Sequence, residues 1–181
     1  MTTLDPIIVD QLDGLLTGET NPITVLANAS ALLNDLMTDL NWAGFYLYND
    51  KTGQLDLGPF QGKVACMHIQ PGNGVVGTSY AQNAVLRVPN VHEFAGHIAC
   101  DSASNAEIVV PITVDNRVVA IMDIDSPTLD RFSENDEAIL TKFGETLAAH
   151  LDTAALNTVY WHACKIMQQR PAWSAPVLPR R

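Results

Sequence analysis

The sequence is poor in cysteine and in basic residues. Its 181 residues include three cysteines, and an odd number does not suit a disulfide framework. Lys and Arg total 10 against 20 for Asp and Glu, which gives a formal net charge of −10 at pH 7. Binding to nucleic acid or to an anionic membrane surface needs a basic patch. We therefore expect neither nucleic acid nor membrane as a partner.

Long apolar runs are also missing. No stretch approaches the roughly 18 apolar residues of a transmembrane helix. The N-terminal residues lack the basic and apolar regions of a secretory signal peptide. We expect a cytoplasmic protein, and in that reducing compartment a cysteine pair is more often catalytic or metal-binding than structural.

Enough apolar material is present for a folded core. Apolar residues make up 47% of the chain and charged residues 17%, which is typical of a globular domain. Hydrophobic periodicity and capping residues predict helices over residues 4–18, 23–40 and 74–83, and from Ser133 to about 168. Strands are predicted over 41–48, 54–57, 63–70, 85–88, 107–114 and 117–125. This order predicts an α+β fold, an antiparallel sheet with helices packed on one face.

The stretch from Gly96 to Pro111 places a cysteine in a loop just before a buried strand. Cys100 lies among small and polar residues, which leave backbone N–H groups free to face a ligand. Glu107 follows seven residues later, at the start of the apolar run, and can be folded back beside the thiol. The alternative is a buried structural cysteine, because free cysteine is among the most buried residue types.

Two further acidic residues end the next strand. Asp123 and Asp125 are two residues apart and so lie on one face, and the partner strand begins with Glu107. We expect the three carboxylates to converge. Such a cluster at an apolar sheet end is costly unless an ammonium group satisfies it or a proton is shared. A solvated turn is the alternative.

An aromatic pair lies on one face of the first predicted strand. Trp42 and Tyr46 flank Gly44, and two aromatic walls with a glycine gap suit a small apolar or sulfonium-like group. An ordinary core face is the alternative. In the segment from Gly72 to Gly77 the sequence matches GxGxxG, but the preceding strand alternates, so we expect a tight turn into a helix and not a dinucleotide site.

Zinc binding is a separate hypothesis. Cys66 with His68, and His97 with Cys100, could supply four ligands, although neither spacing is common for zinc. Alternatively, the two cysteines could meet as a dithiol.

Several motifs together resemble the free methionine-(R)-sulfoxide reductases, which are a catalytic version of the GAF domain. The resemblance runs in order from about Gly18 to Phe143. The motifs are Asn41–Tyr46, Gly58–Cys66, Gly74–Thr78, Gly96–Pro111 and Asp123–Ser126.

This resemblance implies a GAF-like fold with a central six-stranded antiparallel sheet flanked by helices. We expect one catalytic domain over residues 1–168, with its core at about 18–155. The prolines near the C-terminus predict a proline-rich tail over 169–181 that cannot hold a helix. The implied activity is the reduction of free methionine-(R)-sulfoxide to methionine. No bound cofactor or metal is implied, and thioredoxin, itself reduced by NADPH through thioredoxin reductase, restores the enzyme.

The resemblance also assigns roles to residues. Cys100 matches the catalytic cysteine and Cys66 the cysteine that recycles it through a disulfide. We expect Glu107 to donate a proton to the sulfoxide oxygen, with Asp125 as the second choice. The expected substrate-binding residues are Trp42, Tyr46, Ile98, Ala99, Asp101, Asp123 and Asp125.

The sequence departs from the family at one position. Val76 stands where many members have a third cysteine, and Cys164 lies beyond the resemblance, where we expect a buried helix residue. The competing class is a non-catalytic GAF-type module that senses a small molecule or redox state. Such a module needs no set of two cysteines and three carboxylates. GAF-type domains often dimerise through terminal helices, so we expect a homodimer.

Overall fold

The computed structural model describes residues 4–96 and 101–156, which form a sheet and its covering helices. The helices are α1 (Ile7–Leu16), α2 (Pro22–Leu36), α3 (Gly74–Gln82) and α4 (Glu134–Ala149), and η1 (Val91–Glu93) is a single 3-10 turn. The strands are β1 (Trp42–Asn49), β2 (Gln54–Gly62), β3 (His68–Ile69), β4 (Leu86–Val88), β5 (Ala106–Val114) and β6 (Arg117–Ser126). None of these helices is long and apolar enough to cross a membrane.

The six strands form one antiparallel sheet in the order β3-β2-β1-β6-β5-β4. This confirms the predicted α+β fold and its six-stranded sheet. The central strands β1, β5 and β6 are buried along most of their length. A strand buried on both faces needs a cover on each side.

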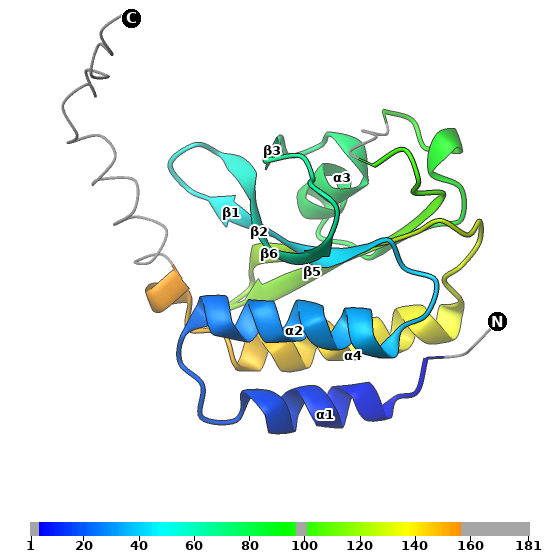
Figure 1. Ribbon diagram of the computed structural model, residues 1–181. Helices are drawn as coiled ribbons and strands as arrows, with labels where there is room; N and C mark the ends of the chain where they lie inside the picture. The colour runs from blue at the N-terminus through cyan, green and yellow to red at the C-terminus, as the bar shows by residue number, and fades with distance from the viewer. Residues whose placement is uncertain (1–3, 97–100, 157–181) are drawn as a thin grey trace, which may run out of the picture.

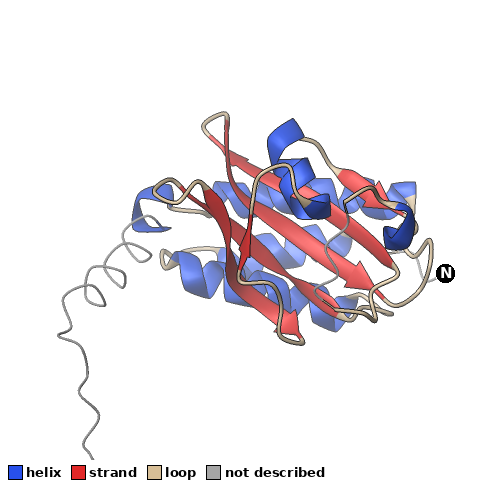
Figure 2. Cartoon of the chain, turned by 90° about the horizontal axis from the view of Figure 1, so that it is seen from above, coloured by secondary structure: helices blue, strands red, loops and turns tan. Residues whose placement is uncertain are grey.

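The two faces of the sheet are covered differently (Figures 1 and 2). Helices α1, α2 and α4 pack on one face over the larger apolar core, which includes Leu12, Phe45 and Phe143. Helix α3 lies on the opposite face, where Val75 and Val76 join a second apolar cluster. The prediction that the helices pack on one face is therefore wrong. Helix α3 covers this second face because the face carries apolar side chains of its own, which must be shielded from water.

The predicted strand over residues 63–70 is also wrong in extent. Only His68–Ile69 pairs with β2, and β2 itself runs on to Gly62, past the predicted end at Leu57. Gly62 has φ of +133°, a backbone angle that L side chains rarely adopt. The chain therefore leaves the sheet after Gly62 and returns only at β3.

Two predicted helices end early. Helix α2 stops at Leu36 because Met37 is already extended and Asp39 has φ of +59°. At the start of α4 the predicted cap is confirmed, since Ser133 and Asp136 form a reciprocal capping box. Helix α4 ends at Ala149, and the backbone is helical again at residues 153–156, where the described part of the chain ends. Cys164 and the predicted tail lie outside the described residues.

We predict that Gly44→Ala destabilises the sheet. An added Cβ would lie 2.3 Å from the Cβ of Phe60 and 2.8 Å from the ring of Trp42. The free energy of unfolding, measured by urea denaturation, is expected to fall by about 1–3 kcal/mol because the core is overpacked. Gly14→Ala in α1 is the control, because it meets open space and should be neutral or stabilising by up to about 1 kcal/mol. Equal stability of the two variants would contradict this account.

Candidate active site

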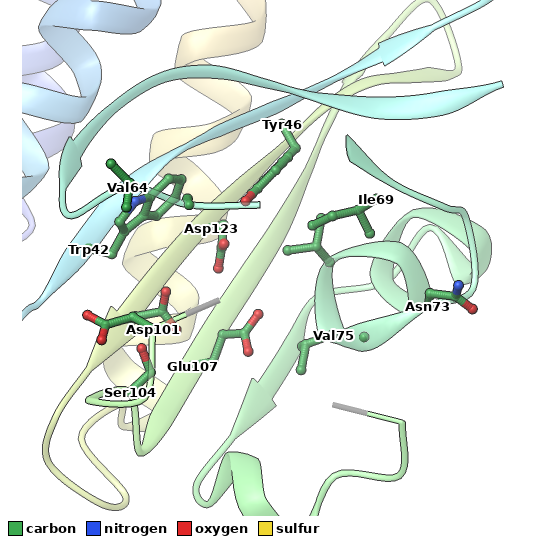
Figure 3. A pocket seen from close by; sticks show the side chains of 14 residues that line it. Trp42, Tyr46, Val64, Ile69, Asn73, Val75, Asp101, Ser104, Glu107 and Asp123 are labelled. Carbon is green, nitrogen blue, oxygen red and sulfur yellow. The ribbon is translucent and has the colours of Figure 1, made fainter. Parts of the chain in front are cut away.

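A pocket opens on the α3 side of the sheet, at the end where β1, β5 and β6 meet (Figure 3). Its walls come from these strands, from the start of α3 and from two segments outside the sheet. The lining residues are Trp42, Tyr46, Val64, Ala65, Ile69, Asn73, Gly74, Val75, Val76, Asp101, Ser104, Glu107, Asp123 and Asp125.

Strand register brings the predicted acidic and aromatic residues together. Asp125 on β6 pairs with Trp42 on one side and Glu107 on the other. Residues directly opposite in an antiparallel sheet share a face, so these three side chains form one row. Asp123 lies two residues back on the same face and pairs with Gly44, which leaves space above it. The pocket floor therefore follows from the hydrogen-bond ladder itself.

The three carboxyl groups form a compact cluster in which Glu107 and Asp123 are buried and Asp125 is half-buried. Their nearest oxygens all lie within 4.8 Å of one another, a spacing that would also suit a hard cation. Glu107 is 5% exposed and Asp123 6% exposed. Among the described residues, neither Oδ1 of Asp123 nor Nε1 of Trp42 has a hydrogen-bond partner. A buried acceptor and a buried donor left unpaired are costly, which favours a polar ligand at this place.

Burial shifts the pKa of each of these acids. It raises the pKa of Asp125 to about 7, with the charge of Asp101 adding to the rise and a hydrogen bond from Ser104 opposing it. Burial and then the charge of Asp125 raise the pKa of Glu107 and of Asp123 well above their ordinary values. Carboxylates crowded in this way share protons, so the cluster can act as an acid near neutral pH.

Tyr46 forms the aromatic wall of the pocket together with Trp42, and it also contacts the Cys66 segment, which is the stretch over residues 63–67. Its ring stacks with Trp42 at 5.9 Å between centroids, and its hydroxyl donates a 3.0 Å hydrogen bond to the backbone carbonyl of Cys66. Burial, followed by the charges of the three acids, raises the pKa of Tyr46, so the phenol stays protonated and remains a donor.

Cys66 is disulfide-bonded in this structure. A disulfide sulfur is not a thiolate ligand, and His68 instead contacts Asp56 at 2.7 Å. Neither the disulfide of Cys66 nor the contact between His68 and Asp56 favours the zinc hypothesis. The other proposed ligands, His97 and Cys100, lie outside the described residues, as do the predicted substrate-binding residues Ile98 and Ala99.

Asp101, which follows Cys100, lies at the edge of the pocket. Its carboxylate accepts the backbone N–H of Ala103 at 3.0 Å and the side-chain amide of Asn41 at 3.2 Å, and Lys63 lies 3.5 Å away. The hydrogen bonds from Ala103 and Asn41, and then Lys63, hold the pKa of Asp101 below its ordinary value. No sequence pattern marks Asn41 or Lys63 as a partner of Asp101, although both lie within the motifs that carry the family resemblance.

Known proteins match this chain over most of its length. The GAF domain model matches residues 21–151. The free methionine-R-sulfoxide reductase of Escherichia coli is 50% identical over 148 residues, which cover 82% of this chain and 86% of that protein. This chain belongs to that GAF-domain reductase family.

Solved structures of the reductase family agree. The reduced form of the Staphylococcus aureus fRMsr has a TM-score of 0.78 at 43% identity and covers 84% of this chain and 100% of that one. The Neisseria meningitidis free methionine-R-sulfoxide reductase, solved in complex with its substrate, has a TM-score of 0.78 at 34% identity. It covers 84% of this chain and 89% of that one. The family named from the motifs is therefore confirmed.

The glycine-rich motif has a structural role in this member of the reductase family. Gly72 and Gly74 have φ of +86° and +62°, and α3 begins at Gly74. A Cβ on Gly77 would lie 2.3 Å from the carbonyl oxygen of Gln70. This confirms the predicted tight turn into a helix. Val76 is buried in α3 and lines the pocket.

We predict that the free energy of unfolding depends on pH, and that Asp125→Asn weakens this dependence. The folded protein keeps the Asp125 proton up to about pH 7, whereas the unfolded chain loses it near the ordinary value of 3.8. The folded state thus binds more protons between these limits, so the free energy of unfolding falls as pH rises from 4 through 7. Urea denaturation across this range should show a shallower fall in Asp125→Asn, since Glu107 and Asp123 still contribute. Asp10→Asn, on the exposed side of α1, is the control, and a variant slope equal to the wild-type slope would refute the assignment.

Proposed function

We propose that this protein reduces free L-methionine-(R)-sulfoxide to methionine through Cys100 and Cys66, and that thioredoxin then restores the two thiols. The observation that carries the proposal is a cluster of three carboxyl groups with raised pKa values, which shares its pocket with Trp42, Tyr46 and Ala65, the neighbour of Cys66. A sensor of a small molecule has no need of an acid cluster next to a redox-active cysteine.

Free methionine sulfoxide carries both an ammonium and a carboxylate group. The aspartates of the cluster suit the ammonium, and backbone N–H groups around residues 98–101 suit the carboxylate. The methyl end of the substrate fits against Trp42 and Tyr46. A methionine within a peptide lacks both charges, so it leaves the buried polar groups unpaired and is rejected.

The chemical step needs an acid as well as a thiolate. The Cys100 thiolate attacks the sulfoxide sulfur, while protonation weakens the bond between sulfur and oxygen. Glu107, whose pKa is raised by burial and by Asp125, supplies the proton, and Asp125 is the second candidate. The oxygen passes to Cys100 as a sulfenic acid, and methionine leaves with its sulfur reduced.

Recycling uses the second cysteine. The Cys66 thiol condenses with the sulfenic acid, which forms a disulfide and releases water. Two observations support the pairing of Cys66 with Cys100: Cys66 is disulfide-bonded, and the neighbours of the two cysteines, Ala65 and Asp101, line the same pocket. A dithiol such as thioredoxin then reduces the disulfide by exchange. Because Val76 replaces the third cysteine, this route uses two cysteines only.

Three predictions from the sequence accompany this proposal. They are the division into a domain over residues 1–168 and a tail over 169–181, the homodimer, and the cytoplasmic location.

We predict turnover of free methionine-(R)-sulfoxide and not of the free (S) form or of a peptide-bound sulfoxide. Cys100→Ser should abolish turnover with any reductant. Cys66→Ser should retain turnover with dithiothreitol, which reduces the sulfenic acid directly, and lose it with thioredoxin. Cys164→Ser is the matched control and should behave as wild type. If the folded, reduced protein turns over no sulfoxide, it is a ligand-binding GAF module and not a reductase.

We predict that Glu107→Gln lowers kcat/KM by about 100-fold or more, because the amide keeps the shape but cannot donate the proton as a carboxylic acid does. The measurement is initial rate against substrate concentration between pH 5 and pH 9. The wild-type rate should fall on the alkaline side as the acid ionises, and this limb should disappear in the variant. A larger loss in Asp125→Asn than in Glu107→Gln would assign the proton to Asp125.

A further inference from the structure

The segment over residues 63–67 lies outside the paired strands, and its residues Val64 and Ala65 line the pocket. Its side chains divide into two groups. Val64 and Met67 are 87% and 69% exposed, the highest values for large apolar side chains in the parts of the chain that the structure describes. Ala65 and Cys66 are half-buried and pack against the apolar cluster on the α3 side. The segment thus presents two apolar side chains to solvent on either side of its cysteine.

Two backbone hydrogen bonds fix this arrangement. The Tyr46 hydroxyl donates to the carbonyl of Cys66 at 3.0 Å, and the backbone N–H of Leu57 donates to the carbonyl of Met67 at 2.9 Å. The carbonyls of Cys66 and Met67 therefore both accept hydrogen bonds from strands of the sheet. These bonds fix the backbone here and with it the directions of the neighbouring side chains. Because Val64 and Met67 contribute little to the interior, their exposure is a cost to the isolated protein that a partner can offset.

The polar residues at the two ends of the segment complete a familiar pattern. Lys63 is 70% exposed by side chain and His68 61% exposed, and each pairs with an acid, Asp101 and Asp56 respectively. An apolar centre with a polar rim is the ordinary composition of a protein–protein interface.

The chemistry of the disulfide identifies the occupant. A protein dithiol can reduce the Cys66 disulfide only if its thiolate reaches one of the two sulfur atoms. If that atom is the sulfur of Cys66, the protein that carries the thiolate must cover the residues flanking it, which are Val64 and Met67. We infer that residues 63–67 are the docking surface for a thioredoxin-type dithiol protein, which attacks the Cys66 sulfur. This inference rests on the proposed function for the origin of the disulfide.

The exchange proceeds in two balanced steps. The thiolate of the partner forms a bond to the Cys66 sulfur, the existing disulfide breaks, and the other cysteine of this chain leaves as a thiolate that takes up a proton. The second thiol of the partner, as its thiolate, then attacks the mixed disulfide and releases the Cys66 thiolate. This chain gains two thiols, and the partner dithiol is oxidised to a disulfide.

The first test is Met67→Gln, which keeps the length of the side chain and removes its apolar character. Met67 does not line the pocket, and the bond to its backbone is kept. We expect the KM for thioredoxin to rise about fivefold or more, as for truncation of an interface anchor, with turnover in dithiothreitol unchanged. Leu15→Gln is the matched control, because Leu15 is 49% exposed on α1, beyond the opposite face of the sheet. An unchanged KM in Met67→Gln, or an equal rise in Leu15→Gln, overturns the docking surface.

The second test traps the complex. Thioredoxin without its resolving cysteine is mixed with the oxidised protein, and the mixed disulfide is mapped by mass spectrometry. We expect it at Cys66, with slower formation in Met67→Gln, whereas a mixed disulfide at Cys100 overturns the inference. Trapping needs the Cys66 disulfide but not sulfoxide turnover. A wild-type protein that is trapped at Cys66 yet reduces no sulfoxide would therefore contradict the proposed function and leave the docking surface supported.

Discussion

The rest of the structure depends on the burial of three carboxyl groups in one place. An isolated buried carboxylate is so unfavourable that it takes up a proton, and three together cannot all be ionised. Glu107, Asp123 and Asp125 meet this constraint because β1, β6 and β5 hold them in register, on a face that α3 shields from water. The outcome is a reserve of protons at a pH where free aspartic and glutamic acids are fully ionised.

The aromatic residues of the pocket also help to keep water away from the three carboxyl groups. Trp42 stacks with Tyr46 and, at 5.2 Å, with Phe60, and the rings of Trp42 and Tyr46 line the pocket. Gly44 permits this closeness, since a Cβ there would collide with both Trp42 and Phe60. The Tyr46 hydroxyl extends the wall to the Cys66 carbonyl. One strand therefore excludes water from the acids and also fixes the segment that carries the second cysteine.

Much of the fold and of the site could be predicted where local chemistry decides the structure. Asp115 and Asn116 both have positive φ, as expected of a tight hairpin turn, and the two-residue spacing of Asp123 and Asp125 was enough to place both on one face. Ser133, a residue type typical of helix N-caps, likewise predicted the start of α4. These features depend on neighbouring residues and not on distant ones.

The failures concern distant contacts. Residues 63–67 lie in a stretch that the sequence predicts as a strand, but the chain turns away from the sheet at Gly62. The Cys66 carbonyl instead accepts a hydrogen bond from the hydroxyl of Tyr46, which is distant in sequence. The position of α3 depends on how the sheet is covered from both sides, which no short pattern records. Asn41 and Lys63 contact Asp101 across separate loops, so they could not be singled out before the loops were placed.

The two ends of the β5–β6 hairpin differ greatly in how well they tolerate insertions and deletions. Its pocket end carries Glu107 and Asp125 as a directly opposed pair, and deletion of one residue within either strand would turn that strand's acids toward the helical face. Its tip at Asp115–Asn116 lies about 25 Å away along the strand, beyond an irregularity between Ile112 and Thr113 that already breaks the register. The tip is therefore the natural position for inserting a peptide tag or a fluorescent reporter into this chain while the pocket keeps its geometry.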